Sequence, residues 1–154
     1  MPLSPDAETG HTLHATAVAL RGQAVLLRGP SGAGKSDLAL RLLDRDWQLV
    51  GDDYVVVAGQ GGMLTVHALD QQRGMLEVRG IGVQTVPAHR LTDSAIVACV
   101  INLVDVREKV ERMPEERTVI IHDLALPVVD LFPFDASAPL KVELCLERYD
   151  QGGR

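Results

Sequence analysis

The fold is decided around residues 29–36, which read Gly29-Pro30-Ser31-Gly32-Ala33-Gly34-Lys35-Ser36. This stretch fits the pattern G-x-x-x-x-G-K-[ST] at every fixed position. An apolar run, residues 24–27, precedes it, and leucines at helical spacing follow it as far as residue 43. The stretch therefore has the strand, loop and helix setting of a phosphate-binding loop. It predicts a nucleotide-phosphate site.

The prediction of a phosphate site rests on the backbone of the loop and on two of its side chains. Its glycines let successive N–H groups turn inward, and the start of the following helix adds positive charge toward a polyphosphate. Lys35 is expected to reach the terminal phosphates, and the Ser36 hydroxyl to hold Mg²⁺. The alternative is a glycine-rich turn that merely joins a strand to a helix, and it is disfavoured because every fixed position matches in the right setting.

The composition is that of a single globular domain. The chain has 154 residues, of which 46% are hydrophobic and 23% charged, so it is long enough for one core and short for two. Residues 1–10 are polar and contain two prolines, which predicts a flexible N-terminal arm. The domain itself is expected over residues 11–150.

Hydropathy, net charge and the cysteines limit where in the cell the protein is expected and which classes of partner it is expected to have. No apolar stretch approaches the ~20 residues that span a bilayer, and no secretory signal is visible, so we expect a cytoplasmic protein without a membrane partner. The net charge of −6 argues against a nucleic-acid surface. Cys99 and Cys145 lie in apolar patterns without metal-ligand spacing, which predicts two reduced cysteines.

The remaining sequence predicts many short strands and few helices. Strands are expected at residues 13–20, 24–27, 48–50, 54–58, 63–68, 95–103, 118–121 and 124–129. Helices are expected at residues 36–43 and after Ser137, a candidate N-cap ahead of Pro139. The charged residues 107–117 are expected to form an exposed loop. This pattern favours an α/β domain with a mixed sheet.

A phosphoryl-transfer site also needs carboxylates, and two places offer them. Asp52 and Asp53 follow the short strand at residues 48–50, and Asp105 follows Ile101-Asn102-Leu103-Val104 at the end of another expected strand. Neighbouring residues of an extended chain point in different directions, so one acid of the pair can face a metal and the other an acceptor hydroxyl. Asp105 has the position of a conventional Walker-B acid. A solvated turn remains the alternative for the pair, and a loop-entry acid for Asp105.

Three motifs in matching order resemble the C-terminal catalytic domain of HPr kinase/phosphorylase. They are the segment from His14 through the phosphate loop, then Leu49-Val50-Gly51-Asp52-Asp53, then Leu76-Glu77-Val78-Arg79-Gly80-Ile81-Gly82-Val83. The resemblance covers residues 11–130. It implies an α/β P-loop kinase fold with a mixed sheet, like that of phosphoenolpyruvate carboxykinase. It also implies ATP and Mg²⁺ as cofactors and the phosphocarrier HPr, or an HPr-like protein, as the partner phosphorylated on serine.

The resemblance further implies roles for individual residues. Asp52 matches the family's catalytic aspartate, a base toward serine in the kinase direction and an acid when inorganic phosphate attacks phosphoserine and pyrophosphate leaves. Asp53 would assist around the metal and the phosphates. His14 matches a histidine close to the phosphate site, although a histidine at a strand start is more often structural.

Glu77, Arg79 and Arg112 complete the set that the resemblance implies. Glu77 would join Ser36 around Mg²⁺, and Arg79 would neutralise phosphate charge. Arg112 falls where the family has an arginine on a mobile catalytic loop. Since Glu77 and Arg79 alternate along an expected strand, they can also be read as solvated side chains.

The sequence departs from the family pattern at both ends. The regulatory N-terminal domain of longer members is expected to be absent, and residues 128–134 lack the family's stretch with glycine and arginine. The family's oligomeric assembly, a possible homo-oligomer here, and the phosphorolytic direction therefore stay open. Two other functions also remain: a small-molecule P-loop kinase, and a nucleotide-sensing module without phosphotransfer. Whether Asp52 and Asp53 serve phosphotransfer distinguishes these two functions from a protein-serine kinase.

Overall fold

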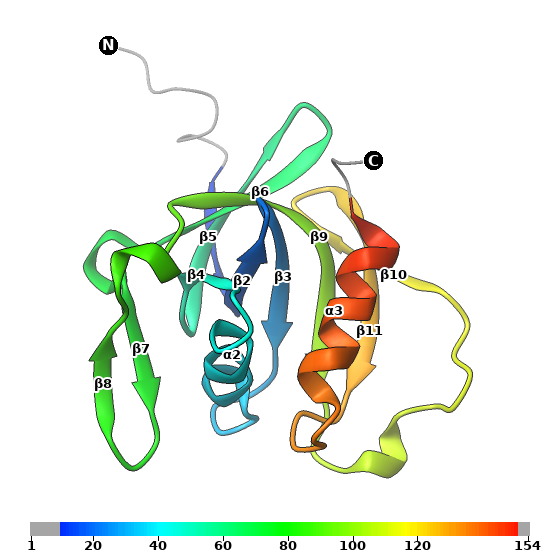
Figure 1. Ribbon diagram of the computed structural model, residues 1–154. Helices are drawn as coiled ribbons and strands as arrows, with labels where there is room; N and C mark the ends of the chain where they lie inside the picture. The colour runs from blue at the N-terminus through cyan, green and yellow to red at the C-terminus, as the bar shows by residue number, and fades with distance from the viewer. Residues whose placement is uncertain (1–9, 151–154) are drawn as a thin grey trace.

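The computed structural model describes residues 10–150, and Figure 1 shows its arrangement. The flexible arm expected over residues 1–10 lies outside the described residues except for Gly10, and the domain boundaries stay predictions. A curled mixed sheet carries two helices against one face, and a separate β-hairpin stands beside the first helix. The expected α/β class with a mixed sheet is confirmed.

The elements lie close to where the sequence predicts them. The main sheet consists of β1 (His11–His14), β2 (Thr16–Leu20), β3 (Gln23–Arg28), β4 (Gln48–Gly51), β5 (Tyr54–Gln60), β6 (Met63–Ala68), β9 (Ser94–Leu103), β10 (Arg117–Ile121) and β11 (Leu124–Leu131). The separate hairpin is formed by β7 (Met75–Val78) and β8 (Gly82–Thr85). The helices are α2 (Lys35–Leu43) and α3 (Ala138–Tyr149), and the short 3-10 turns are η1 (Asp70–Gln72), η2 (Ala88–Arg90) and η3 (Arg107–Lys109).

Strand β9 organises the sheet, whose order is β1-β5-β6-β9-β3-β2-β4. One edge of β9 pairs with β3 in parallel, while the other edge pairs first with β6 in antiparallel and then with β11 in parallel. Because β3, β9 and β11 run in the same direction, the loops that follow them gather at one end of the sheet, at the bottom of Figure 1. In parallel α/β sheets this end is where ligands bind.

Two apolar layers sandwich the sheet, and alternation along the strands supplies both. Val25 and Leu27 of β3 pack on the helix side, whereas Ala24 and Leu26 belong to the second core, on the other side of the sheet. The register of β3 against β9 skips Ala98, which marks a β-bulge. The bulge explains why the adjacent residues Ala98 and Cys99 both pack on the helix side. As predicted, β9 is an almost wholly buried strand.

The two helices are tied together across the same face. Leu38, Leu42 and Leu43 form the buried stripe of α2, at the i, i+4 spacing of an amphipathic helix. Glu143 of α3 accepts hydrogen bonds from Arg45 Nη2 at 2.7 Å and from Trp47 Nε1 at 3.2 Å. The Arg45 guanidinium is the main reason why the pKa of Glu143 is lowered. The link fixes the end of α2 against α3.

Local details refine the sequence expectations. The run expected as one strand at residues 13–20 is divided at Ala15 into β1 and β2, which pair with different partners. Residues 76–83 form most of the separate hairpin. Ser137 precedes α3 as expected, but its backbone is already helical and its side chain makes no cap hydrogen bond. Cys99 and Cys145 are free cysteines. No helix in residues 10–150 is long and apolar enough to cross a membrane.

Candidate active site

The glycine-rich loop, residues 29–36, joins the end of β3 to the start of α2. Gly32 and Gly34 have φ angles of +86° and +105°, in the left-handed region that favours glycine. A side chain on Gly34 would meet the ring of Phe134, because the Phe134 Cζ atom lies 3.0 Å from the place of a Cβ. No side chain caps the first turn of α2. Its N–H groups can therefore bind an anion, as the motif predicts.

Lys35 extends its ammonium group back into this loop. Its Nζ atom donates hydrogen bonds to the carbonyl oxygens of Gly29 at 2.8 Å and Pro30 at 3.1 Å. The side chain is only 5% exposed. The same nitrogen lies 3.8 Å from Asp53 Oδ1, so the cation faces both the loop and the acid pair.

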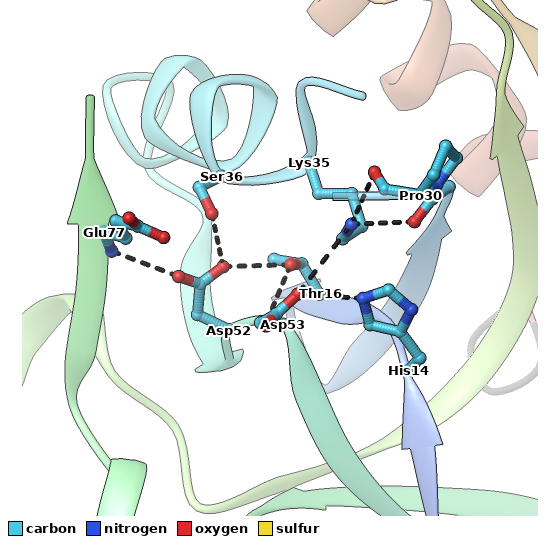
Figure 2. A network of polar contacts seen from close by, with 9 residues as sticks. His14, Thr16, Pro30, Lys35, Ser36, Asp52, Asp53 and Glu77 are labelled. Atoms are coloured by element: carbon cyan, nitrogen blue, oxygen red, sulfur yellow. Dashed lines mark hydrogen bonds and ion pairs between the residues drawn. The ribbon is translucent and has the colours of Figure 1, made fainter. Parts of the chain in front are cut away.

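Asp52 is buried and faces the start of α2. Its Oδ1 atom accepts hydrogen bonds from Ser36 Oγ at 2.7 Å and from Thr16 Oγ1 at 2.9 Å, and its Oδ2 atom accepts from the Glu77 N–H at 3.1 Å. Figure 2 shows these donors converging from three different elements. The carboxylate is therefore held in one orientation, next to the hydroxyl that the motif assigns to a metal.

Thr16, which has no role predicted from the sequence, links the two acids. Its hydroxyl donates to Asp52 and accepts from the Asp53 N–H at 3.0 Å, and the residue is fully buried. A polar side chain inside an otherwise apolar strand was the available signal, because a buried hydroxyl needs partners. The sequence does not reveal which residues those partners are.

Asp53 turns away from Asp52 toward His14 and Lys35. Its φ angle is +67°, and the Tyr54 N–H bonds back to the Asp52 carbonyl at 2.7 Å. A non-glycine residue with this backbone is strained, and such strain gathers at functional sites. Its Oδ1 atom lies 2.9 Å from His14 Nε2, and its side chain is 48% exposed. His14 in turn stacks on Tyr54 with 4.8 Å between ring centroids. This carboxylate is accessible to a substrate.

The separate hairpin closes the site on the other side. In Figure 2 the Glu77 side chain lies on the side of β7 that faces Ser36 and Asp52. The Arg79 guanidinium reaches to 3.8 Å from where a Cβ on Gly32 would stand. Both side chains are exposed. The structure thus brings Glu77 and Arg79 to the loop, where a phosphate chain can meet them.

Two candidates lie away from this network. Asp105, the alternative acid, is 74% exposed and pairs with Lys109 at 2.7 Å, and this pair lowers the pKa of Asp105. Arg112 lines a cavity of about 1330 Å³ together with β11 and α3. The structure therefore does not bring Arg112 to the acids, because its loop runs along the outer side of α3 (Figure 1).

The donor set beside the loop fits Mg²⁺. Within residues 10–150 no group of three or more His, Cys, Asp or Glu side chains could hold a metal by itself. Mg²⁺ does not need such a cage, since it is bound by one or two carboxylates together with water and phosphate oxygens. Ser36 and Asp52 are in contact and Glu77 stands beside them, so all the donors are oxygens. Asp53, expected among the metal residues, faces His14 and Lys35 instead.

Comparisons with a family model and with individual proteins point to the same family. The family model described as "HPr Serine kinase C-terminal domain" matches residues 7–135. The HPr kinase/phosphorylase of Chlorobium phaeobacteroides is 34% identical over 127 residues, which cover 77% of this chain and 39% of that protein. The one of Brevibacillus brevis is 32% identical over 126 residues, covering 77% and 40%. The chain therefore spans about two fifths of the length of these relatives.

A solved structure is similar along nearly the whole chain. It is the Hpr(Ser) kinase/phosphatase from Coxiella burnetii, with a TM-score of 0.79 and 28% identity. The match covers 90% of this chain and 95% of the solved one. The overall fold is thus shared with a protein of this type.

Proposed function

The chain belongs to the HPr serine kinase C-terminal domain family, and from this we propose that it transfers the γ-phosphoryl group of ATP to a serine of HPr or of an HPr-like phosphocarrier. One observation carries the proposal. Two adjacent carboxylates at the loop point in different directions. Asp52 accepts from the Ser36 hydroxyl, and Asp53 faces His14 and Lys35 with its side chain 48% exposed. Transfer to a serine hydroxyl calls for a base in addition to a carboxylate on the metal side, and Asp53 is a second carboxylate available for that role.

Nucleotide binding is assigned to the glycine-rich loop. Its N–H groups and the start of α2 would surround the phosphates, and Lys35 would exchange its carbonyl partners for phosphate oxygens. Ser36, Asp52 and Glu77 would hold Mg²⁺. When bound, Mg²⁺ neutralises charge on the phosphate oxygens. Arg79, at the mouth of the loop, would add a planar cation for the transferred group.

Asp53 is the residue best placed to serve as the base. The resemblance assigns this role to Asp52, but Asp52 is buried under three hydrogen bonds, whereas Asp53 is half exposed. A base must come within hydrogen-bond reach of the serine hydroxyl. The serine oxygen then attacks the γ-phosphorus, the bond from phosphorus to the departing ADP oxygen breaks, and the serine proton passes to Asp53. His14 positions this carboxylate.

The name of the curated relatives, HPr kinase/phosphorylase, supports the reverse chemistry at the same site. In that direction an oxygen of inorganic phosphate attacks the phosphorus of phosphoserine, the bond to the serine oxygen breaks, and pyrophosphate leaves. The serine oxygen takes up the proton that Asp53 carries. No second set of residues is needed.

The direct experiment gives the protein ATP, Mg²⁺ and the phosphocarriers encoded in the same genome, and maps any phosphate by mass spectrometry. The proposal predicts one phosphoserine, formed only with the nucleotide. A small-molecule kinase would instead consume ATP with a metabolite and leave the proteins unmodified. A nucleotide sensor would bind ATP without turnover. Either result would refute the proposal.

A further inference from the structure

The turn that follows β11, residues 132–136, forms a wall beside the glycine-rich loop. It belongs to the end of the sheet where the parallel strands β3, β9 and β11 finish. Phe134 sits in this turn with its ring edge against Gly34 of the loop. The side chain is nevertheless 57% exposed. A large aromatic ring thus stands next to the phosphate loop with much of its surface uncovered.

Neighbouring side chains hold this turn in place. From α2, Arg41 donates through Nη2 to the Pro133 carbonyl at 2.5 Å. From η3, Arg107 donates through Nε to Asp135 Oδ1 at 2.9 Å, and this contact lowers the pKa of Asp135. The Arg107 guanidinium also lies over the Phe132 ring, 5.2 Å from its centroid. The wall is therefore built before any ligand arrives.

The two aromatic rings of the turn support each other. Phe132 and Phe134 meet edge to face, with 5.7 Å between their centroids and an angle of 78°. This arrangement is a favoured one for aromatic pairs. Phe132 is thereby covered from one side by Arg107 and contacted by Phe134. Phe134 keeps an exposed surface beside the loop.

We propose that Phe134 is the nucleobase subsite of this protein, on which the aromatic base of a nucleotide stacks while the glycine-rich loop holds its phosphates. The inference rests on the proposed function, since it requires nucleotide phosphates in the loop. Aromatic side chains stack on any base because every base has a π-face. The subsite therefore favours a nucleoside diphosphate or triphosphate over a polyphosphate without a base. It discriminates little between one base and another.

The test compares two ligands on the full chain. Titration calorimetry with Mg²⁺ measures the Kd of ADP, which has a base, and of pyrophosphate, which does not. The variants are Phe134→Ala, Phe134→Leu and Phe134→Tyr. Ile120→Ala on β10 serves as the matched control, because Ile120 is also an exposed apolar side chain, at 64%. A thermal melt of each variant without ligand checks that it folds.

The result expected is a selective loss. Phe134→Ala should raise the Kd of ADP by about five- to tenfold, the lower part of the range for loss of base stacking on an aromatic side chain. Phe134→Leu should lose nearly as much, because leucine fills the space but has no ring, and Phe134→Tyr should keep the wild-type Kd. Pyrophosphate should bind all of them, and Ile120→Ala should match the wild type with both ligands.

Three outcomes overturn the inference. They are an unchanged ADP Kd in Phe134→Ala, an equal loss for ADP and pyrophosphate, and full retention by Phe134→Leu, which would indicate packing against Gly34 alone. Failure of the proposed function would give a different result, seen already in the wild type. In that case the wild type would bind neither ligand, or would bind both without transferring phosphate to any protein.

Discussion

The buried hydroxyl of Thr16 provides a stringent test of the acid pair. We consider Thr16→Val, which keeps the shape of the side chain and removes the oxygen. The hydroxyl makes two hydrogen bonds, one to the Asp52 carboxylate at 2.9 Å and one from the Asp53 N–H at 3.0 Å. Both are lost in the variant, and the residue is too buried for water to replace them.

The magnitude follows from these two bonds. A hydrogen bond to a charged group contributes about 1.5–3 kcal/mol and one between neutral groups about 0.5–1.5 kcal/mol. Their sum predicts that Thr16→Val lowers the free energy of unfolding by about 3 kcal/mol. For a domain of this size each kcal/mol shifts Tm by roughly 2–4 °C, so Tm should fall by roughly 6–12 °C.

Thr16→Ser is the control, because serine keeps the hydroxyl and loses one methyl group. Deleting one buried methyl group typically costs about 0.5–1.5 kcal/mol. The measurement is urea unfolding of the three proteins followed by circular dichroism. If the hydroxyl links the acids as described, the serine variant is the more stable of the two. A valine variant as stable as the wild type, or more stable than the serine variant, would refute the reasoning.

Three further perturbations test other parts of the structure. Lys35→Ala removes the cation but leaves the N–H groups of the loop, so the fold should persist while the rise in Tm caused by Mg-ATP shrinks; an equal rise in both proteins would contradict this. Glu143→Gln should lower stability at neutral pH, where the carboxylate is paired with Arg45. Because the folded pKa of Glu143 is lowered, its contribution is present above the unfolded pKa of about 4.3 and lost as pH falls through the folded value. The gap in Tm between the two proteins should therefore close from about pH 4 downward, and a constant gap would exclude the ion pair as its source. Cys99 is fully buried and burial raises its pKa, so iodoacetamide at pH 8 should modify it only after unfolding; rapid modification of the native protein would show that this core opens.

The sequence predicts the glycine-rich loop and α2 well because their determinants are local. The glycines, Lys35 and the leucine stripe lie within fifteen residues, and each has a direct conformational or chemical reason to be there. The mixed sheet could be inferred from the number of short strands. The sequence does not predict that β7 and β8 form a hairpin apart from the main sheet. Strand preference depends on the neighbours that pack against each face, and these neighbours are set by the tertiary structure.

The site residues that were difficult to predict depend on contacts distant in sequence or on backbone conformation. The positive φ angle of Asp53 separates the directions of the two acids, and adjacency alone does not reveal which one turns outward. Thr16 meets Asp52 across 36 positions of sequence. Asp105 follows a buried strand as a Walker-B acid does, yet it pairs with Lys109 in solvent. Arg112 was assigned to the site by resemblance, but it lines a cavity beside β11 and α3.

Single-turnover transfer from ATP to the phosphocarrier serine, in the wild type, Asp52→Asn and Asp53→Asn, tests the central claim most directly. With Asp53 as the base, Asp53→Asn should bind Mg-ATP like the wild type and transfer phosphate about 10²–10⁴-fold more slowly. With Asp52 on the metal side, Asp52→Asn should need about 10–100-fold more Mg²⁺. Transfer at the wild-type rate by Asp53→Asn, or an unchanged Mg²⁺ requirement in Asp52→Asn, would contradict the division of roles.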